Sequence, residues 1–128
     1  NEMVFRENAA KFETGTPSVA AIYAGAEGLR MVNEVGPIAI RKRTSELTQH
    51  LVARLRENNF QLRTPEDPER HASITMVEVE DPAATVRHLG GRDIIVDYRP
   101  GAVRVSPYFY NTLEDIDTLV EALCDTRS

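Results

Sequence analysis

The sequence has very little cysteine, no long apolar run and no signal-like start. Its single cysteine, Cys124, has no partner for an internal disulfide, which is typical of a protein from the reducing cytoplasm. The longest apolar run is only a few residues, so no segment is predicted to span a membrane. The first residues lack the basic-then-apolar order of a secretory signal. We therefore expect a cytoplasmic protein without a membrane partner.

The charge balance argues against a nucleic-acid partner. The 128 residues carry a net charge of −5, and the longest basic cluster is Arg41-Lys42-Arg43. Affinity for a phosphate backbone depends on clustered lysine and arginine, which this chain lacks. The composition, 41% hydrophobic and 27% charged, is that of a globular domain with its own core.

Two helices are predicted in the N-terminal half. Apolar residues at three- and four-residue spacing predict a helix over 17–35, with Thr16 at or beside its N-cap and Gly36 at its C-cap. A second helix is predicted over 37–58, and we interpret it as a connecting helix with a narrow apolar seam. That seam consists of Ile40, Leu47, Leu51 and Leu55.

The remaining chain predicts the order strand, strand, helix, strand, strand, helix. The strands are expected at 60–62, 73–80, 93–98 and 102–106, and the helices begin at Asp81-Pro82 and Thr112. The residues predicted to face the core are Ile74, Met76, the valines of 73–80, Ile116, Leu119, Val120 and Leu123. This order predicts an α+β fold, a small open and largely antiparallel sheet covered on one face by helices.

Arg104 is the main candidate site residue. Strand alternation places Val103 and Val105 on one face and Arg104 on the other. A guanidinium on a rigid strand can hold a carboxylate with two hydrogen bonds, but the same position suits an arginine that only faces solvent. Arg99, in the predicted turn before it, either helps or is an ordinary turn residue. The residues alone leave both questions open.

Gly15-Thr16 forms the second candidate. At a helix start, this pair is either a plain cap or a seat for an anion, which free backbone N–H groups would bind. No metal site is predicted, because no two histidines share an element at ligand spacing. The histidines, which we interpret as surface or cap residues, are His50, His71 and His88.

Three stretches together resemble the C-terminal part of class V aminotransferases. These are fold-type I pyridoxal-phosphate enzymes, a group that includes cysteine desulfurases and kynureninases. The stretches are KFETGTPS (11–18), IIVDYRPGAVRVSPYFYNT (94–112) and LEDIDTLVEAL (113–123). The resemblance covers the chain from Phe5 to Leu123.

The resemblance implies roles for the candidate residues. Gly15 and Thr16 would contact the phosphate of pyridoxal 5'-phosphate bound in the neighbouring subunit of a homodimer. Arg104 would bind the α-carboxylate of a small amino-acid substrate, with Arg99 beside it. No catalytic residue is assigned within this chain.

The chain also departs from the family pattern. Lys11 stands where the family commonly has arginine, and neither Lys11 nor Lys42 matches the lysine that binds the cofactor. We therefore expect a piece of a longer protein. Residues 1–36 would belong with a missing large domain, 37–58 would form the connecting helix, and 59–128 would be the C-terminal small α+β domain.

The resulting prediction is the C-terminal domain of a pyridoxal-phosphate-dependent, aminotransferase-like enzyme. The full-length parent would bind the cofactor, whereas this chain alone would lack the means to complete the chemistry. The sequence leaves the reaction type open, although the DYRP turn favours the kynureninase-like branch. The alternatives are a stand-alone α+β ligand-binding or protein-interaction module and a catalytically inactive family member.

Overall fold

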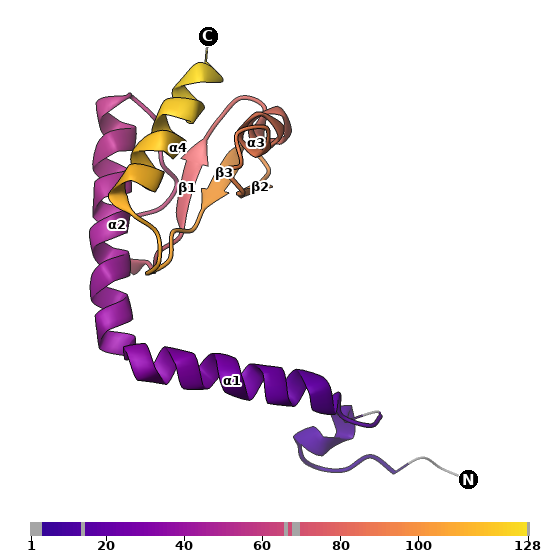
Figure 1. Ribbon diagram of the computed structural model, residues 1–128. Helices are drawn as coiled ribbons and strands as arrows, with labels where there is room; N and C mark the ends of the chain where they lie inside the picture. Colours follow the sequence, from indigo (N-terminus) through magenta and orange to yellow (C-terminus); the bar gives the residue numbers. More distant parts are fainter. Residues whose placement is uncertain (1–3, 14, 66, 68–69, 128) are drawn as a thin grey trace. The chain divides into compact units, whose positions relative to one another are not determined.

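The computed structural model describes residues 4–13, 15–65, 67 and 70–127 (Figure 1). The chain divides into two compact units, Asn1–Pro37 and Ile38–Ser128. In chain order the elements are η1 (Ala9–Phe12), α1 (Val19–Val35), α2 (Pro37–Glu57), β1 (Thr75–Glu78), α3 (Pro82–Gly90), β2 (Asp97–Arg99), β3 (Ala102–Val105) and α4 (Leu113–Asp125). None of the described helices is long and apolar enough to cross a bilayer.

The N-terminal unit contains η1, a single 3-10 turn that the sequence did not predict, and α1. The Asn8 side chain caps η1 by accepting the Ala10 N–H at 3.0 Å. No residue of α1 is buried. Its apolar side chains therefore face solvent in this chain, and Ile22 and Leu29 are 60% and 66% exposed.

The start of α1 differs from the prediction. The helix begins at Val19, and its N-cap is Ser18 rather than Thr16. The residue before a proline is disfavoured in helical conformation, so Thr16 is held out of the helix by Pro17. Ser18 itself is extended, with φ −70° and ψ 92°, which delays the first turn further.

The boundary between the two long helices follows the predicted capping chemistry. Gly36 has a φ of +90° and ends α1, and Pro37 begins α2, as predicted. At its other end α2 is closed by Asn59, which has a φ of +59°, while the Phe60 N–H donates to the Leu55 carbonyl at 2.9 Å. This arrangement satisfies carbonyls that the helix end would otherwise leave unpaired.

The predicted seam of α2 is confirmed and lies deep in the core. Leu47, Leu51 and Leu55 are fully buried, and they belong to one cluster with side chains from β1, β3, α3 and α4. Contacts therefore group α2 with the C-terminal unit from Ile38 onward. The assignment of 1–36 to a larger domain stays a prediction.

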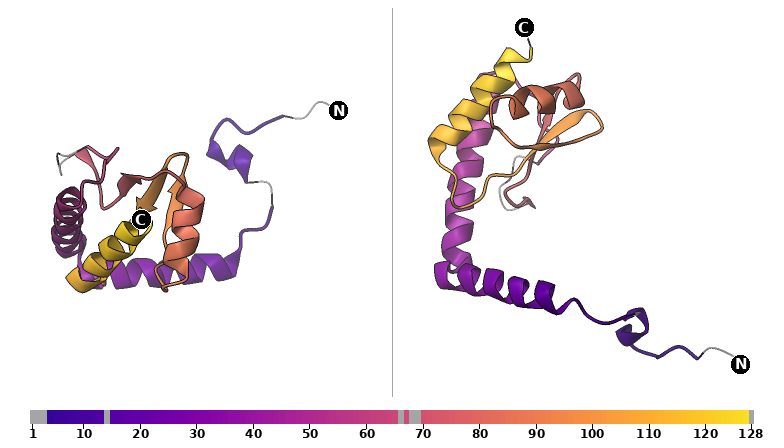
Figure 2. Two further views of the ribbon diagram at one scale, coloured as in Figure 1. Left: turned by 90° about the horizontal axis from the view of Figure 1, so that it is seen from above. Right: turned by 45° about the vertical axis from the view of Figure 1, so that its right-hand side comes forward.

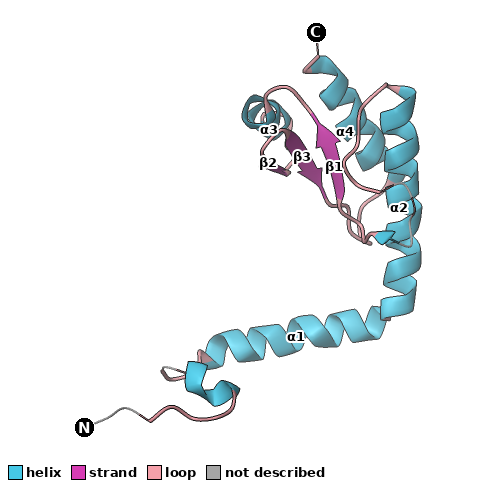
Figure 3. Ribbon diagram, turned by 180° about the vertical axis from the view of Figure 1, so that it is seen from behind, coloured by secondary structure: helices cyan, strands magenta, loops and turns pink. Residues whose placement is uncertain are grey.

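The sheet has three antiparallel strands in the order β1-β3-β2, so β3 is central (Figure 3). The predicted strand at 60–62 is wrong, because in the described part of the chain this segment forms a single isolated bridge, from Leu62 to Val77. The strand at 93–98 is also shorter than predicted. Asp93, with a φ of +60°, and the Ile94 N–H, bonded to the Leu89 carbonyl, complete the end of α3. The ladder can form only after this turn.

Helices cover one face of the sheet, as predicted. The inward side chains of β1 are Thr75 and Val77, both fully buried, whereas the predicted core residues Ile74 and Met76 are only half-buried. Strand alternation explains the correction, since Ile74 and Met76 lie on the opposite face from Val77.

The last helix behaves as its sequence predicts. Thr112 and Asp115 form a reciprocal capping box at its start, and its buried stripe contains the predicted Ile116, Leu119, Val120 and Leu123. Figure 2 shows α4 beside α2 in the C-terminal unit. The two helices are joined by Asp117, whose Oδ1 accepts from Arg54 Nε at 2.8 Å and lies 2.9 Å from His50 Nε2.

The contrast between α1 and α2 generates a stability prediction. Leu51→Ala should lower the free energy of unfolding by about 2–5 kcal/mol, because it opens a cavity beneath the sheet. Leu29→Ala, on the exposed side of α1, should change it by less than about 0.5 kcal/mol. Urea unfolding of both variants of this chain measures the difference. Equal losses of unfolding free energy in the two variants would contradict the finding that α2 is packed in the core and α1 is not.

Candidate functional site

The sheet face away from the helices carries the candidate site. On β3, Val103 and Val105 are buried while Arg104 is half-buried on the opposite face, which confirms the predicted alternation. The strand register places Met76 of β1 on one side of Arg104 and Asp97 of β2 on the other. Arg104 is therefore fixed on the central strand and pairs across the ladder with a carboxylate residue.

Asp97 lies near both of the arginines that the sequence singled out. Arg99 Nη1 donates to Asp97 Oδ2 at 2.5 Å and to the Tyr98 carbonyl at 2.7 Å. The Tyr98 N–H donates to the other carboxylate oxygen of Asp97 at 2.8 Å. Asp97 thus lies beside Arg99 through direct bonds and opposite Arg104 through the register.

The surroundings of Asp97 favour its charged form. The hydrogen bond from Arg99 lowers the pKa of this carboxyl most, followed by the Tyr98 amide, and the charge of Arg104 adds to the effect. The cluster of Arg99, Asp97 and Arg104 consequently carries one net positive charge at neutral pH. That charge matches a single carboxylate.

The two arginines differ in how far they are already engaged. Within the described residues, the Arg104 guanidinium has no hydrogen bond or ion pair, although its charge acts on Asp97 at longer range. The Arg99 guanidinium is held by Asp97 and by its own strand. A partly buried guanidinium with unused donors is the group able to form the two parallel bonds that carboxylates accept.

The Gly15-Thr16 pair lies in the N-terminal unit, just before α1. Both residues are exposed. The α1 N-cap, Ser18, makes no side-chain cap bond, and the first turn contains no acidic residue. Unsatisfied N–H groups and the positive end of the helix dipole fit a phosphate group, and no nearby first-turn carboxylate opposes it. Thr16 would act from the approach to the helix rather than as its cap.

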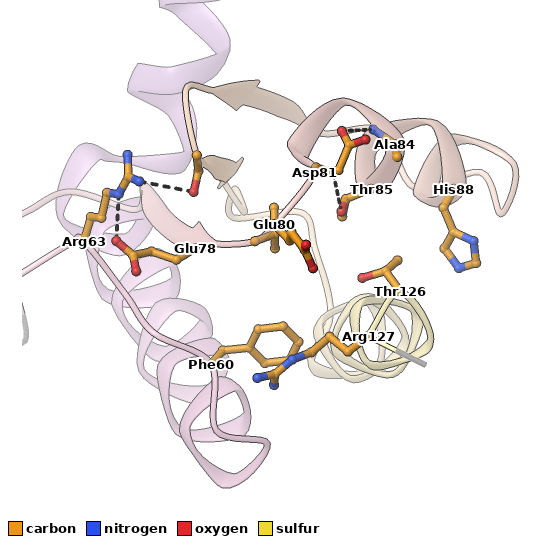
Figure 4. Close-up of a pocket in the computed structure, with 12 residues that line it drawn as sticks. Phe60, Arg63, Glu78, Glu80, Asp81, Ala84, Thr85, His88, Thr126 and Arg127 are labelled. Carbon is orange, nitrogen blue, oxygen red and sulfur yellow. Dashed lines mark hydrogen bonds and ion pairs between the residues drawn. The ribbon is translucent and has the colours of Figure 1, made fainter.

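A large hollow of the C-terminal unit lies elsewhere (Figure 4). It measures about 910 Å³ between the end of β1, α3 and the end of α4, and none of the predicted site residues lines it. Two of its charged groups serve the fold: Asp81 caps α3 by accepting the Ala84 N–H, and Arg127 lies 4.4 Å from the Phe60 ring centre. No group of three metal-binding side chains occurs among the residues described.

Sequence reasoning missed Asp97, although a signal for it existed. A two-residue turn at Pro100–Gly101 pairs Arg99 with Ala102, and counting outward pairs Asp97 with Arg104. The sequence prediction placed Arg99 in the turn instead of in the strand. The pairing of Arg99 with Ala102, and with it that of Asp97 with Arg104, was therefore not predicted. It also missed Arg63, which reaches the same hairpin from a segment remote in sequence.

The Asp97 cluster predicts an ordered series of pKa values. In the unmodified chain the pKa of Asp97 should lie below its ordinary value of 3.8. Arg99→Ala removes the largest cause and should raise it most, and Arg104→Ala should raise it less. Carboxyl-carbon NMR titration gives each value.

The sign of the linked stability change follows from that shift. Because the folded-state pKa is depressed, this interaction stabilises the fold above pH 3.8 and is lost as the pH falls through the lower folded-state value. A larger rise of the Asp97 pKa in Arg104→Ala than in Arg99→Ala would contradict the assigned pairing of Asp97 with Arg99.

Comparison with known proteins gives a consistent family. The model of the class-V aminotransferase family matches residues 1–119. The chain is 28% identical to the uncharacterized aminotransferase YcbU of Bacillus subtilis, over 90% of this chain and 31% of that protein. It is also 28% identical to the kynureninase of Shouchella clausii, over 91% of this chain and 29% of that protein. The chain thus spans about a third of the length of these relatives.

A solved structure supports the fold. The apo cysteine desulfurase from Thermococcus onnurineus NA1 matches 94% of this chain and 34% of its own, with a TM-score of 0.84 and 23% identity. At that identity the likeness shows a shared fold. The family match over residues 1–119 and this fold lead to one conclusion: the chain belongs to the class-V aminotransferase family, a family of pyridoxal-phosphate enzymes.

Proposed function

We propose that this chain is the C-terminal part of a pyridoxal-phosphate-dependent enzyme acting on an amino acid, and that Arg104 binds the substrate α-carboxylate. The observation that carries the proposal is the unused, half-buried Arg104 guanidinium on the central strand. A strand paired on both sides fixes the Cα position of Arg104, and its planar guanidinium matches a carboxylate.

Arg99 has a supporting role in this proposal. Its bond to Asp97 offsets that negative charge, which would otherwise oppose a substrate carboxylate beside Arg104. With Asp97 balanced by Arg99, the charge of Arg104 remains for the substrate. This arrangement suits one carboxylate better than two, because the second guanidinium is already engaged.

We propose further that Thr16 and the N-terminal N–H groups of α1 contact the cofactor phosphate, with Gly15 allowing close approach of the backbone. The uncapped first turn of α1 supports this role. When bound, pyridoxal phosphate supplies an electron sink for chemistry at the amino-acid α carbon. Following the family resemblance, the phosphate would belong to the neighbouring subunit of a cytoplasmic homodimer.

The exposed face of α1 supports the assignment of 1–36 to a larger domain. Its side chains Val19, Ile22, Tyr23 and Leu29 are 58% to 72% exposed. Apolar side chains in such a series are usually covered in the functional protein. We propose that the part of the relatives' length absent from this chain, or the second subunit, covers them. Among the relatives' activities, the DYRP turn favours a kynureninase-like reaction.

The carboxylate role predicts a specific kinetic effect in the longer protein. Arg104→Ala should raise KM for the amino acid on the order of 100-fold, because two charge-assisted hydrogen bonds are lost. Arg104→Lys should still raise KM about tenfold, since a point charge does not reproduce the fork. Steady-state kinetics and the cofactor absorbance spectrum measure both variants.

Thr16→Ala provides the contrasting variant. It should weaken retention of pyridoxal phosphate during dialysis, whereas Arg104→Ala should leave retention and the spectrum nearly intact. An unchanged KM in Arg104→Ala would remove the proposed substrate role.

A further inference from the structure

We propose that Arg63 is a positioning residue for the substrate-carboxylate site, because it ties the β2–β3 turn to β1 and thereby holds Asp97 opposite Arg104. The inference rests on the proposed role of Arg104. It concerns a residue that lies outside the three stretches that carry the resemblance, 11–18, 94–112 and 113–123.

The Arg63 guanidinium donates hydrogen bonds to three acceptors. Its Nε donates to Glu78 Oε1 at 2.9 Å on β1 (Figure 4). Its Nη1 donates to the Pro100 carbonyl at 2.7 Å, and its Nη2 to the Gly101 carbonyl at 3.2 Å. One side chain therefore joins the outer edge strand to the turn that connects the other two.

Arg63 is itself held in place. Its backbone N–H donates to the Met76 carbonyl at 3.0 Å, and the Glu78 N–H donates to the Gln61 carbonyl at 2.9 Å. These bonds lay the segment around Leu62 along the free edge of β1. The guanidinium thus starts from a fixed backbone rather than from a mobile loop.

The β2–β3 turn is one that needs outside support. Pro100 fixes a negative φ, and Gly101 has a φ of +74°, the order found in type II turns. Two-residue hairpins favour turns of the mirror-image types, whose twist matches that of the strands. β2 gains little from packing, since its three residues are all exposed. Contacts to the turn carbonyls therefore add a constraint on this strand to its ladder with β3 and its contacts with α3.

Gly101 shows how closely Arg63 approaches. A Cβ placed on Gly101 would lie 2.5 Å from Arg63 Nη2. The guanidinium therefore packs directly on the turn. Because β2 pairs with β3 alone among the described residues, the turn sets the register that places Asp97 opposite Arg104. Loosening the turn would release the Arg99–Asp97 pair from its place beside Arg104.

The first test uses amide hydrogen exchange in this chain to measure how far Arg63 stabilises the β2–β3 turn. Arg63→Ala should accelerate exchange across 97–101 at least about fivefold, while the amides shared by β1 and β3 change little. Arg63→Lys keeps a charge near Glu78 but loses the fork of the guanidinium. Its exchange rate across 97–101 should therefore lie between those of the unmodified chain and Arg63→Ala. Arg92→Ala is the matched control, because Arg92 pairs with Asp125 and is 45% exposed against 46% for Arg63.

The second test measures substrate binding in the longer protein loaded with pyridoxal phosphate. Arg63→Ala should raise KM for the amino acid about three- to tenfold, with kcat and the cofactor spectrum nearly unchanged. The control Arg92→Ala should leave KM unchanged. Exchange that matches the Arg92→Ala control would overturn the inference. So would faster exchange with an unchanged KM, provided that Arg104→Ala raises KM. If Arg104→Ala leaves KM unchanged, the proposed function fails, and the positioning role of Arg63 fails with it.

Discussion

The alternation of side chains along β3 is the constraint on which the rest of the C-terminal unit depends. Val103 and Val105 are buried against the helices, so Arg104 between them is directed to the other face. Because β3 is bonded to β1 and β2, its backbone cannot turn to relieve either side. Core packing and the position of the candidate guanidinium are thus set by the same short strand.

The outer face of the sheet is organised by pairing of charges. Asp97 engages Arg99, Glu78 engages Arg63, and Arg104 is left with unused donors within the described residues. Exposed ion pairs add little to stability. Their effect here is to decide which guanidinium remains free for an anion. That division of roles follows from strand register and not from the number of arginines.

Local chemistry made much of the fold predictable from the sequence. Gly36-Pro37, Asp81-Pro82 and the Thr112 capping box marked real helix boundaries, because caps depend on neighbouring residues. Strand limits were less predictable, since Leu62 forms only an isolated bridge and Asp93 and Ile94 complete the end of α3 instead of starting a strand. The partnership of Arg63 with the Pro100 turn lies 37 positions away and leaves no local signal.

A crystal structure of the longer protein with an amino acid bound tests the central claim most directly. We predict that the α-carboxylate accepts two hydrogen bonds from Arg104 at about 2.7–2.9 Å. Asp97 should remain bonded to Arg99 in that complex. A carboxylate bound by another cation, with Arg104 facing solvent, would contradict that claim.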